Sequence, residues 1–235
     1  MHWDGPILFQ SQRLGAYQSA LNQLQTQGLI FPCICSRQDI REQEGVYPGT
    51  CRQLSIEDLT ADRQPYAIRC RVDNQCIKYC DVLQGQQAQQ LVTEVGDFIV
   101  KRKDGLFAYQ LAVVIDDAFQ GVNHVVRGID LLDSTPRQIY LQQVLKLAQP
   151  AYAHIPIIVN HDGQKLSKQH HARALDLHQP VQTLYSALHY LQQAPPENLL
   201  KSSVKELLDW AIEHWDMQKM KNMLQVPETV YNLTL

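Results

Sequence analysis

The chain has 235 residues, of which 45% are hydrophobic and 19% are charged, and its formal net charge is −3 at pH 7. This composition is typical of a folded globular protein with one or two domains, and it excludes a disordered chain. A net negative charge argues against a protein that depends on non-specific DNA contacts. The net negative charge is still compatible with a local basic face, either at 101–103 or at Arg69 and Arg71. The alternative is that these positions carry ordinary solvated side chains.

The sequence has no signal for a membrane protein or a secreted one. No apolar run approaches the roughly 20 residues that cross a bilayer, and the N-terminus lacks a basic segment followed by an apolar one. We therefore expect a cytoplasmic protein without a membrane partner.

The N-terminal third predicts one helix and several short strands. Tyr17, Leu21 and Leu24 repeat at helical spacing within 11–27, and Gly28 is placed to end that helix. The polar segment that follows is typical of a loop region. The segment 29–35 is short and apolar, and short strands are expected in the segments 66–83 and 97–102.

From residue 107 the pattern changes to alternating strands and helices. The run FAYQLAVVIDD is almost continuously apolar, which is typical of a strand covered on both faces, and AHIPIIVN predicts a second buried strand. Between them, DSTPRQIYLQQVLKLA predicts a helix with Ser134 or Thr135 as its cap and Pro136 in its first turn. This alternation predicts an α/β fold with a parallel sheet.

After about residue 180 the sequence predicts helices. Ser203 and Glu206 have the spacing of a capping box at the start of SSVKELLDWAIEHW. An apolar stripe follows at helical spacing, and we interpret it as a packing face rather than a partner-binding surface. Its members are Val204, Leu207, Leu208, Ala211, Ile212 and Trp215.

Three of the six cysteines form a candidate metal site. Cys33 and Cys35 are one residue apart, and Cys51 follows on the same loop-rich segment. Three thiolates suit a structural zinc ion, which needs a fourth ligand, and the local candidates are Asp39, Glu42, Glu44 and Tyr47. The alternative is that Cys33 and Cys35 are small residues of a strand.

The other three cysteines, Cys70, Cys76 and Cys80, fall in a segment with strand character. Disulfides are not expected in a cytosolic chain, so we interpret these residues as buried thiols rather than as a second metal site.

The stretch DGQKLSKQ places Lys165 and Lys168 on either side of Leu166 and Ser167. On spacing alone, these lysines suit a solvated loop as well as a loop that binds a polyanion. Likewise, Tyr109 suits a core aromatic residue as well as a ligand-binding hydroxyl, and Arg127 suits a surface ion pair as well as a carboxylate-binding fork.

Taken together in this order, FAYQLAVVIDD, HVVRGIDLLDSTPRQ and DGQKLSKQ resemble the second half of the catalytic domain of class I glutamyl- and glutaminyl-tRNA synthetases. Within that superfamily, HWDGPILFQSQR, KRKDGLFAYQLAVVIDDAFQGV and the Cys-x-Cys, Tyr, x-x-x-Cys pattern resemble the glutamyl-Q tRNA(Asp) synthetase family. The resemblance covers nearly the whole chain and is weakest in 52–95 and after 190.

The resemblance implies a set of site residues and cofactors. Lys165, Ser167 and Lys168 would bind ATP with Mg²⁺, and the two lysines would act as catalytic residues. Tyr109 and Arg127 would hold L-glutamate. A structural Zn²⁺ would be held by four residues, with Tyr47 selected as the fourth ligand, namely Cys33, Cys35, Tyr47 and Cys51.

The resemblance also implies an activity and a domain organisation. Glutamate would be activated by ATP and then transferred to queuosine in the anticodon arm of tRNA(Asp). The class I synthetase-like α/β catalytic domain would span 1–180, and 31–96 would be an inserted zinc-binding α+β subdomain that contacts the tRNA. The segment 181–235 would be helical, with no room for an anticodon-binding domain, and the protein would be a monomer.

One part of the family pattern is not found in this sequence. Relatives begin with a strand and a His-x-Gly-His-like loop that binds ATP, whereas this chain begins MHWDGP, and neither His2 nor His154 matches that loop. We therefore expect the N-terminal part of the nucleotide fold to be missing, through a misassigned start or a fragment. The alternatives are an inactive remnant that retains at most tRNA binding, or a fragment of a discriminating glutamyl-tRNA synthetase.

Overall fold

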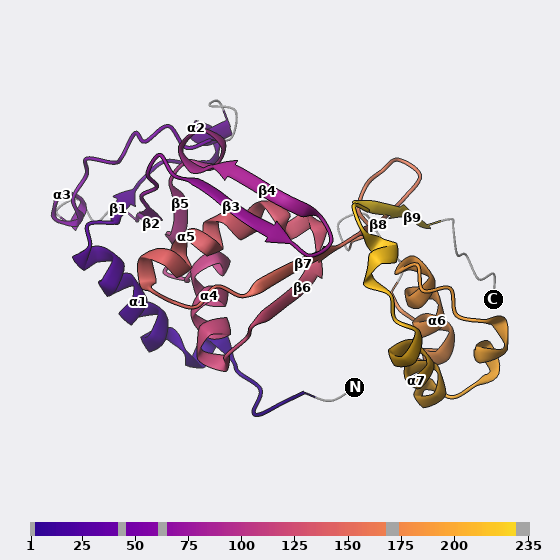
Figure 1. Cartoon of the computed structure of the whole chain (residues 1–235). Helices are drawn as coiled ribbons and strands as arrows, with labels where there is room; N and C mark the ends of the chain where they lie inside the picture. The colour runs from indigo at the N-terminus through magenta and orange to yellow at the C-terminus, as the bar shows by residue number, and fades with distance from the viewer. Residues whose placement is uncertain (1–2, 42–45, 61–64, 168–173, 229–235) are drawn as a thin grey trace. The chain divides into compact units, whose positions relative to one another are not determined.

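The computed structural model describes residues 3–41, 46–60, 65–167 and 174–228. It divides into two compact units (Figure 1). Unit 1 comprises Met1–Tyr79, Ala88–Asn123 and Asp133–Pro150, and unit 2 comprises Cys80–Gln87, His124–Leu132 and Ala151–Leu235. Among the described residues, no helix is both long enough and apolar enough to cross a membrane.

Unit 1 contains a layer of three helices, α1 (Leu14–Thr26), α4 (Tyr109–Gln120) and α5 (Thr135–Leu145), which contact one another (Figure 1). The helix predicted within 11–27 is confirmed, with Tyr17, Leu21 and Leu24 buried on its inner face. Gly28 follows the helix with φ +69°, a left-handed conformation that glycine adopts without strain.

A buried carboxylate joins α1 to α4. Asp116 accepts hydrogen bonds from Tyr17 Oη at 2.6 Å, from Arg13 Nε at 2.6 Å and from Gln10 Nε2 at 3.3 Å. Burial and the bond to Asp116 raise the pKa of Tyr17 to about 12, so its hydroxyl remains a donor at neutral pH. The network fixes the N-terminal segment against α4.

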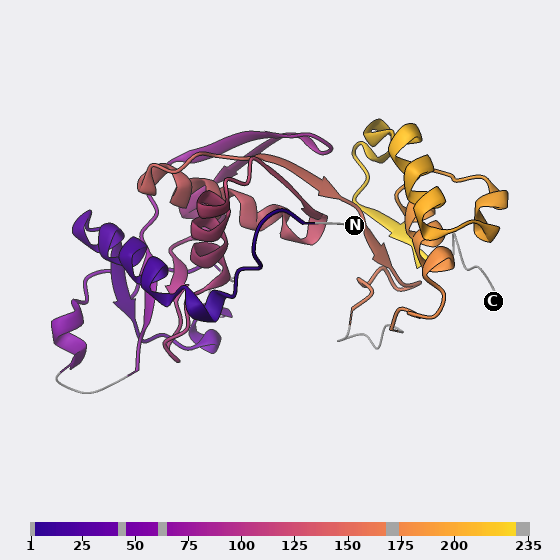
Figure 2. The same cartoon turned by 90° about the horizontal axis from the view of Figure 1, so that it is seen from below.

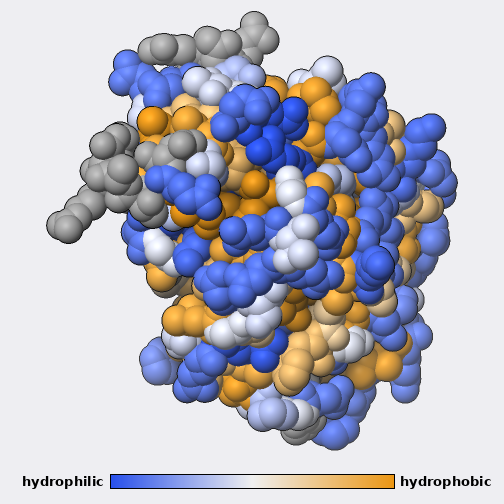
Figure 3. All heavy atoms as spheres, turned by 90° about the vertical axis from the view of Figure 1, so that its left-hand side faces the viewer, coloured by the Kyte–Doolittle hydropathy of each residue, from blue (hydrophilic) through white to orange (hydrophobic). Residues whose placement is uncertain are grey.

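The sheet of unit 1 is antiparallel, with strand order β1 (Ile30–Cys33), β2 (Ala67–Cys70) and β5 (Phe98–Lys101). Strands β2 and β5 lie where the sequence predicts strands, and β1 lies in the short apolar segment 29–35. Short helical segments complete the unit, namely η1 (Gln10–Gln12), α2 (Arg37–Arg41), α3 (Ile56–Thr60) and η2 (Leu91–Val95). On the face that carries α1 to α3, hydrophilic residues cover most of the surface and apolar residues show between them (Figure 3).

The strand predicted for FAYQLAVVIDD is wrong, because this run forms helix α4. Leu111, Ala112 and Val114 are buried, whereas Tyr109 and Phe119 are 46% and 67% exposed. A helix that is covered on most of its circumference has a nearly continuous apolar sequence, and periodicity cannot distinguish such a helix from a buried strand.

A second sheet has the strand order β4 (Gly85–Gln90), β3 (Cys76–Asp81), β7 (Ala151–Ile155) and β6 (His124–Gly128). Strand β7 is parallel to both β6 and β3. The predicted parallel pairing is therefore confirmed for the part of the sheet that lies in unit 2. The carboxyl ends of β3, β6 and β7 meet at one edge, where parallel α/β sheets bind their ligands.

The strand predicted over AHIPIIVN is split in two at Pro156. Its first half is β7, and its second half, β8 (Ile157–Val159), pairs instead with β9 (Gln225–Pro227) in a separate two-stranded sheet. Proline has no backbone N–H to donate, so it ends one ladder and allows the chain to enter another. In unit 2, β9 returns to lie beside β8, as both views show (Figures 1 and 2).

Helices α6 (Pro180–Tyr190) and α7 (Val204–His214) pack against each other in unit 2. The predicted capping box is confirmed, since Ser203 and Glu206 bond reciprocally. The apolar stripe is only partly a packing face: Leu207 and Ala211 are buried, but Ile212 is 77% exposed and Trp215 is 42% exposed. Unit 2 also contains the short helices η3 (Ile129–Ser134, which extends into unit 1), η5 (Glu197–Lys201) and η6 (Met217–Met220).

Candidate active site and metal centre

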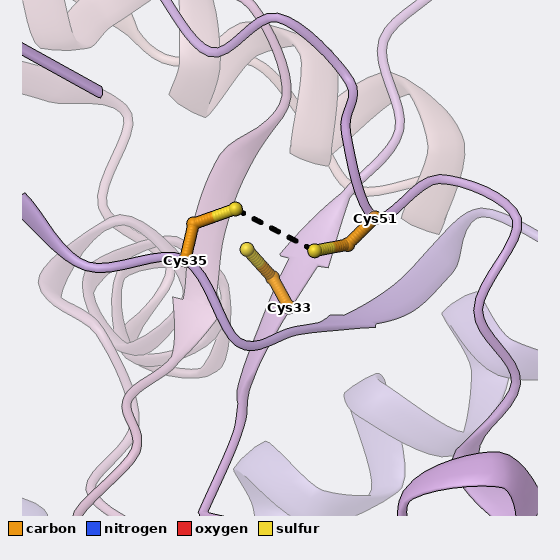
Figure 4. Close-up of side chains that lie close together, drawn as sticks. All are labelled: Cys33, Cys35 and Cys51. Atoms are coloured by element: carbon orange, nitrogen blue, oxygen red, sulfur yellow. Dashed lines mark hydrogen bonds between the residues drawn. The ribbon is translucent and has the colours of Figure 1, made fainter. Parts of the chain in front are cut away.

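Three thiols meet in unit 1 next to the end of strand β1. Cys33 is the last residue of that strand, Cys35 follows two residues later, and Cys51 comes from the turn after residue 50. Their Sγ atoms lie within 4.8 Å of one another, and Figure 4 shows the three side chains pointing toward a common centre. The Sγ atoms of Cys35 and Cys51 are 3.5 Å apart.

Tyr47 brings an oxygen atom to the same cluster. Its hydroxyl lies 3.4 Å from Cys33 Sγ and 3.9 Å from Cys35 Sγ, and it accepts a hydrogen bond from the Cys51 backbone N–H at 2.8 Å. Of the other candidate fourth ligands, Asp39 accepts a bond from the Ser36 backbone N–H at 2.6 Å, while Glu42 and Glu44 lie outside the described residues.

The thiols and the phenol have strongly perturbed proton affinities. Burial raises the pKa of Cys35 to about 11 and also raises the pKa of Tyr47. Burial opposes ionisation of Cys51 too, but hydrogen bonds from Tyr47, the backbone and the neighbouring thiols outweigh it and lower the Cys51 pKa. The cluster therefore does not favour several negative charges unless a cation compensates for them.

This arrangement fits a zinc ion. With Zn–S bonds of about 2.3 Å, the sulfur atoms of a tetrahedral site lie roughly 3.8 Å apart, close to the 3.5 Å between Cys35 and Cys51. Within the described residues, these three cysteines are the one group of His, Cys, Asp and Glu side chains with metal-ligand spacing.

Arg69 also belongs to the cluster, although no motif in the sequence indicates this. Its Nε donates to Cys33 Sγ at 3.2 Å, its Nη1 donates to the Asp97 carbonyl at 2.7 Å, and its Cζ lies 3.9 Å from the Tyr47 ring centroid. The interpretations of Arg69 as part of a basic surface face or as a solvated side chain are both wrong, because the residue is only 5% exposed. It is brought to Cys33 by the antiparallel register of β1 and β2.

The three remaining cysteines were predicted to be buried thiols, and this is correct only for Cys70. Cys76 and Cys80 are exposed, because they alternate with inward-facing residues along β3. In a strand with one solvated face, every second residue points outward.

A cavity of about 310 Å³ adjoins the thiol cluster. Cys33 and Cys35 form part of its wall, together with the basic side chains of Arg102 and Lys103. Lys103 also donates from Nζ to the Ile34 carbonyl at 2.6 Å, which ties the segment 101–103 to the loop between the cysteines. Asp104 also lines the cavity and pairs with Arg102, so the basic side chains of the wall outnumber the acidic one beside the candidate metal centre.

Unit 2 carries a second polar cluster at the carboxyl ends of its parallel strands. Arg127 of β6 lies opposite His154 of β7 in the sheet register, and Arg127 Nε donates to His154 Nε2 at 3.1 Å. The other ring nitrogen, His154 Nδ1, lies 2.6 Å from Asp81 Oδ2. His154 and Asp81 are fully buried, whereas Arg127 is half-buried.

Asp81 is held in place by several donors. Its Oδ1 accepts from the backbone N–H groups of Leu83 at 3.0 Å, Gln84 at 2.9 Å and His154 at 3.2 Å. Burial works to raise the pKa of Asp81, but the bond from His154 and the backbone donors outweigh it and lower that pKa. Asp81 is therefore an ionised carboxylate whose oxygens are occupied by fixed donors.

The lysine stretch begins with a tight turn after β8. Asn160 Oδ1 accepts from the N–H groups of Asp162 and Gln164, and Gly163 has φ +75°. Lys165 then pairs with Asp130 through an Nζ–Oδ2 contact of 2.5 Å, and Ser167 is half-buried. Lys168 lies outside the described residues.

The two predicted glutamate-binding residues lie in different units, and each has its own surroundings. Tyr109 is the first residue of α4 in unit 1, and its 46% exposure excludes the alternative of a core aromatic residue. Arg127 lies in unit 2 beside His154. No sequence spacing could have indicated the contact between Asp81, Arg127 and His154, because it depends on the pairing of β3, β6 and β7.

Comparisons with known proteins identify relatives across the chain. The family described as tRNA synthetases class I (E and Q), catalytic domain, matches residues 1–201. A glutamyl-Q tRNA(Asp) synthetase of Pseudomonas paraeruginosa is 46% identical over 226 residues, which cover 96% of this chain and 75% of that protein. The protein of the same name from Thiobacillus denitrificans is 51% identical over 224 residues, covering 93% and 73%.

Two solved structures share the fold. A glutamate tRNA ligase from Elizabethkingia meningosepticum, solved with its amino acid, matches with a TM-score of 0.70 at 20% identity, over 94% of this chain and 52% of that one. The glutamate-tRNA synthetase of Elizabethkingia anophelis matches with a TM-score of 0.71, also at 20% identity, over 96% and 54%. The chain thus spans about half the length of these two proteins.

Proposed function

The chain belongs to the class I tRNA synthetase (E and Q) family and is a homologue of the glutamyl-Q tRNA(Asp) synthetases, and we propose that it activates L-glutamate with ATP and transfers the glutamyl group to queuosine of tRNA(Asp). The observation that supports this most strongly is the identity of 46% and 51% to proteins of that name over more than nine-tenths of the chain. The family predicted from the sequence is therefore confirmed, and the substrates are the proposal.

In the first step, an oxygen of the glutamate carboxylate attacks the α-phosphorus of ATP. The bond from that phosphorus to the bridging oxygen breaks, and pyrophosphate leaves with the electron pair. The attacking group is already an anion, so this step needs no general base, and the protein contributes alignment and charge stabilisation.

Lys165 and Lys168 are proposed to stabilise the negative charge that develops on the departing pyrophosphate, with Ser167 as a further contact to ATP. Mg²⁺ bound with ATP would supply additional positive charge. The ion pair of Lys165 with Asp130 supports a role that depends on the nucleotide, because a triphosphate can compete with a single exposed carboxylate for the ammonium group. The sequence predicts a loop for this stretch, and such a loop can close over ATP when the nucleotide is bound.

Arg127 and Tyr109 are proposed to bind glutamate. An arginine fork can pair with a carboxylate through two parallel hydrogen bonds, and a tyrosine hydroxyl can contact an amino or carboxyl group. The exposure of Tyr109 and the half-buried position of Arg127 at the carboxyl end of β6 support these roles.

In the second step, a hydroxyl group of queuosine attacks the carbonyl carbon of glutamyl-adenylate. A new ester bond forms, AMP leaves, and the hydroxyl proton is lost. We propose that the anticodon arm of tRNA(Asp) is held partly by the inserted segment 31–96, within a catalytic domain at 1–180 and ahead of a C-terminal segment at 181–235. The excess of basic side chains in the wall of the cavity beside the thiol cluster supports contact with phosphates.

We further propose that a structural zinc ion is held by Cys33, Cys35, Tyr47 and Cys51. When bound, it would cross-link the loop of the inserted segment and stabilise its fold. The convergence of the three Sγ atoms and the Tyr47 hydroxyl supports this. The protein would act as a cytoplasmic monomer.

The test is ATP–pyrophosphate exchange with the full chain, followed by transfer of labelled glutamate to tRNA(Asp). Exchange should require glutamate, and Lys168→Ala should reduce it by about 10²-fold, the loss typical of removing one charge-stabilising donor. Lys205→Ala, at an exposed pair with Asp209, is the matched control and should leave exchange unchanged.

Transfer should occur to tRNA(Asp) that contains queuosine and not to the same tRNA with guanosine in its place. Exchange that is unaffected by Lys168→Ala would refute the role of that lysine, and absence of any glutamate-dependent exchange would refute the proposed activity.

A further inference from the structure

The buried contact between Asp81, His154 and Arg127 defines which nitrogen of His154 carries the proton. An arginine side chain can only donate hydrogen bonds, so His154 Nε2, at 3.1 Å from Arg127 Nε, must be the acceptor. The ring proton therefore lies on Nδ1, where it is donated to Asp81 Oδ2 at 2.6 Å. The geometry is consistent with this neutral tautomer alone, because protonation of both nitrogens would place two donors face to face.

Burial supports the neutral form. It lowers the pKa of His154, and Arg127 acts in the same direction, whereas Asp81 and Asp130 oppose it. These are the charged groups that face the ring from β3, β6 and η3. Asp81 in turn cannot rotate, because its other oxygen accepts three backbone N–H groups.

These contacts restrict the orientation of the Arg127 side chain. Its Nε is bound by His154, its Nη2 donates to the Leu131 carbonyl at 3.3 Å, and its Cζ lies 5.6 Å from the Tyr152 ring centroid. Fixing Nε fixes the plane of the guanidinium group. A planar fork with a fixed orientation loses less conformational entropy when it pairs with a carboxylate.

We propose that Asp81 and His154 are positioning residues for the amino-acid substrate, and that they act by presenting the Nε2 lone pair of His154 to Arg127 so that its guanidinium is oriented toward the substrate carboxylate. This inference rests on the proposed function, in which Arg127 binds glutamate. Asp81 and His154 are fully buried and 73 residues apart in sequence. The inference gives this pair a role in substrate affinity in addition to any role in folding.

Two substitutions of His154 separate positioning from a structural role. Glutamine places an acceptor oxygen near the position of Nε2, so His154→Gln keeps a partner for Arg127 and weakens the contact to Asp81. Asparagine places its amide near Nδ1, so His154→Asn keeps the contact to Asp81 and leaves Arg127 Nε without its acceptor. A purely structural role predicts the same effect on glutamate binding for both variants.

Asp81→Asn tests the tautomer. The amide group that this substitution introduces can donate to His154 Nδ1, which would move the ring proton to Nε2 and place it against Arg127 Nε–H. The oxygen that accepts the three backbone N–H groups is retained. This variant should therefore disturb Arg127 while leaving the local backbone contacts in place.

The experiment is calorimetric titration of the full chain and its variants with L-glutamate and, separately, with a non-hydrolysable ATP analogue. His154→Asn and Asp81→Asn should weaken glutamate binding by about 10- to 100-fold, the loss expected when a buried hydrogen bond to a charged group is removed. His154→Gln should stay within about threefold of the wild type, and binding of the ATP analogue should be unchanged in all three.

Nitrogen-15 NMR of the histidine rings provides a readout that is independent of the substrate. The wild type should show His154 with a protonated Nδ1 and an unprotonated Nε2, assigned by loss of the signal in His154→Gln, and Asp81→Asn should reverse this pattern. Wild-type glutamate affinity in His154→Asn, equal losses in the Gln and Asn variants, or a proton on Nε2 in the wild type would overturn the inference and leave the proposed function standing. Absence of glutamate binding by the wild type would overturn both.

Discussion

Arg69 donates a hydrogen bond from Nε to Cys33 Sγ at 3.2 Å, and both side chains are buried. The guanidinium group also lies over the Tyr47 ring, so one cation contacts two of the four proposed zinc ligands. A zinc ion bound by three thiolates and a phenolate would leave the centre with a net negative charge. A buried arginine at this position lowers the electrostatic cost of that charge.

We predict that Arg69→Met weakens zinc binding by about 10- to 100-fold, the usual effect of removing a residue that bonds to a metal ligand. Chelator competition would measure the affinity. Arg71→Met is the matched control, because the Arg71 guanidinium donates instead to the Arg52 carbonyl at 2.6 Å and lies over the Phe31 ring. Equal zinc affinities in the wild type and Arg69→Met would show that Cys33 does not need this neighbour.

Replacement of a proposed ligand should remove the metal altogether. We predict that Cys51→Ser lowers the zinc content from one ion per chain to near zero and lowers the thermal midpoint. A loss of about 3 kcal/mol corresponds to roughly 6–12 °C for a chain of this size. A chelator should lower the wild-type midpoint by a similar amount. Cys76→Ser, at an exposed position on β3, is the control and should retain its zinc.

Helix α7 allows the contribution of a helix cap to stability to be compared with that of a buried side chain in the same helix. Leu207 is fully buried, so Leu207→Ala should destabilise the protein by about 2–5 kcal/mol through lost burial and a cavity. Ser203→Ala removes the capping box and should cost about 1 kcal/mol. Ile212→Ala on the exposed side should stay within about 0.5 kcal/mol of the wild type. Denaturant midpoints would measure all three, and a large loss at Ile212 would indicate that this residue is covered in solution.

Local patterns predicted much of the fold. The helical spacing of Tyr17, Leu21 and Leu24 predicted α1, and the pairing of Ser203 with Glu206 predicted the start of α7, because caps and amphipathic faces depend on residues close in sequence. The error at α4 has a different origin. A helix that is buried on most sides loses the polar face that gives it a recognisable period.

The candidate sites were predictable where they depend on a compact motif. The spacing of Cys33, Cys35 and Cys51 indicated a common centre, and their Sγ atoms do converge. The contacts of Arg69 and His154 could not be predicted in the same way. Each reaches its partner through the register of paired strands, and register depends on packing across the whole sheet rather than on local sequence.

The pair of Asp81 and His154 also predicts how stability depends on pH. Burial lowers the pKa of His154, so the unfolded chain takes up a proton below about pH 6.5 while the folded chain does not. Burial opposes ionisation of Asp81, but its hydrogen bonds outweigh this and lower its pKa, so unfolding also takes up a proton there at lower pH. In both cases the unfolded state binds more protons, and stability must fall as the pH falls.

We therefore predict that the free energy of unfolding decreases from neutral pH toward pH 5 and that His154→Gln makes this decrease shallower, because it removes the group whose proton uptake favours unfolding. Denaturant titrations at several pH values between 5 and 7.5 would measure the slope. His161→Gln is the control: the His161 side chain is 83% exposed and its contact with Asp162 is open to solvent, which screens such pairs, so the substitution should change the slope little. If the curves of the wild type and His154→Gln run parallel over this range, then His154 is protonated to the same extent in both states, and the neutral ring assigned to the folded protein would be wrong.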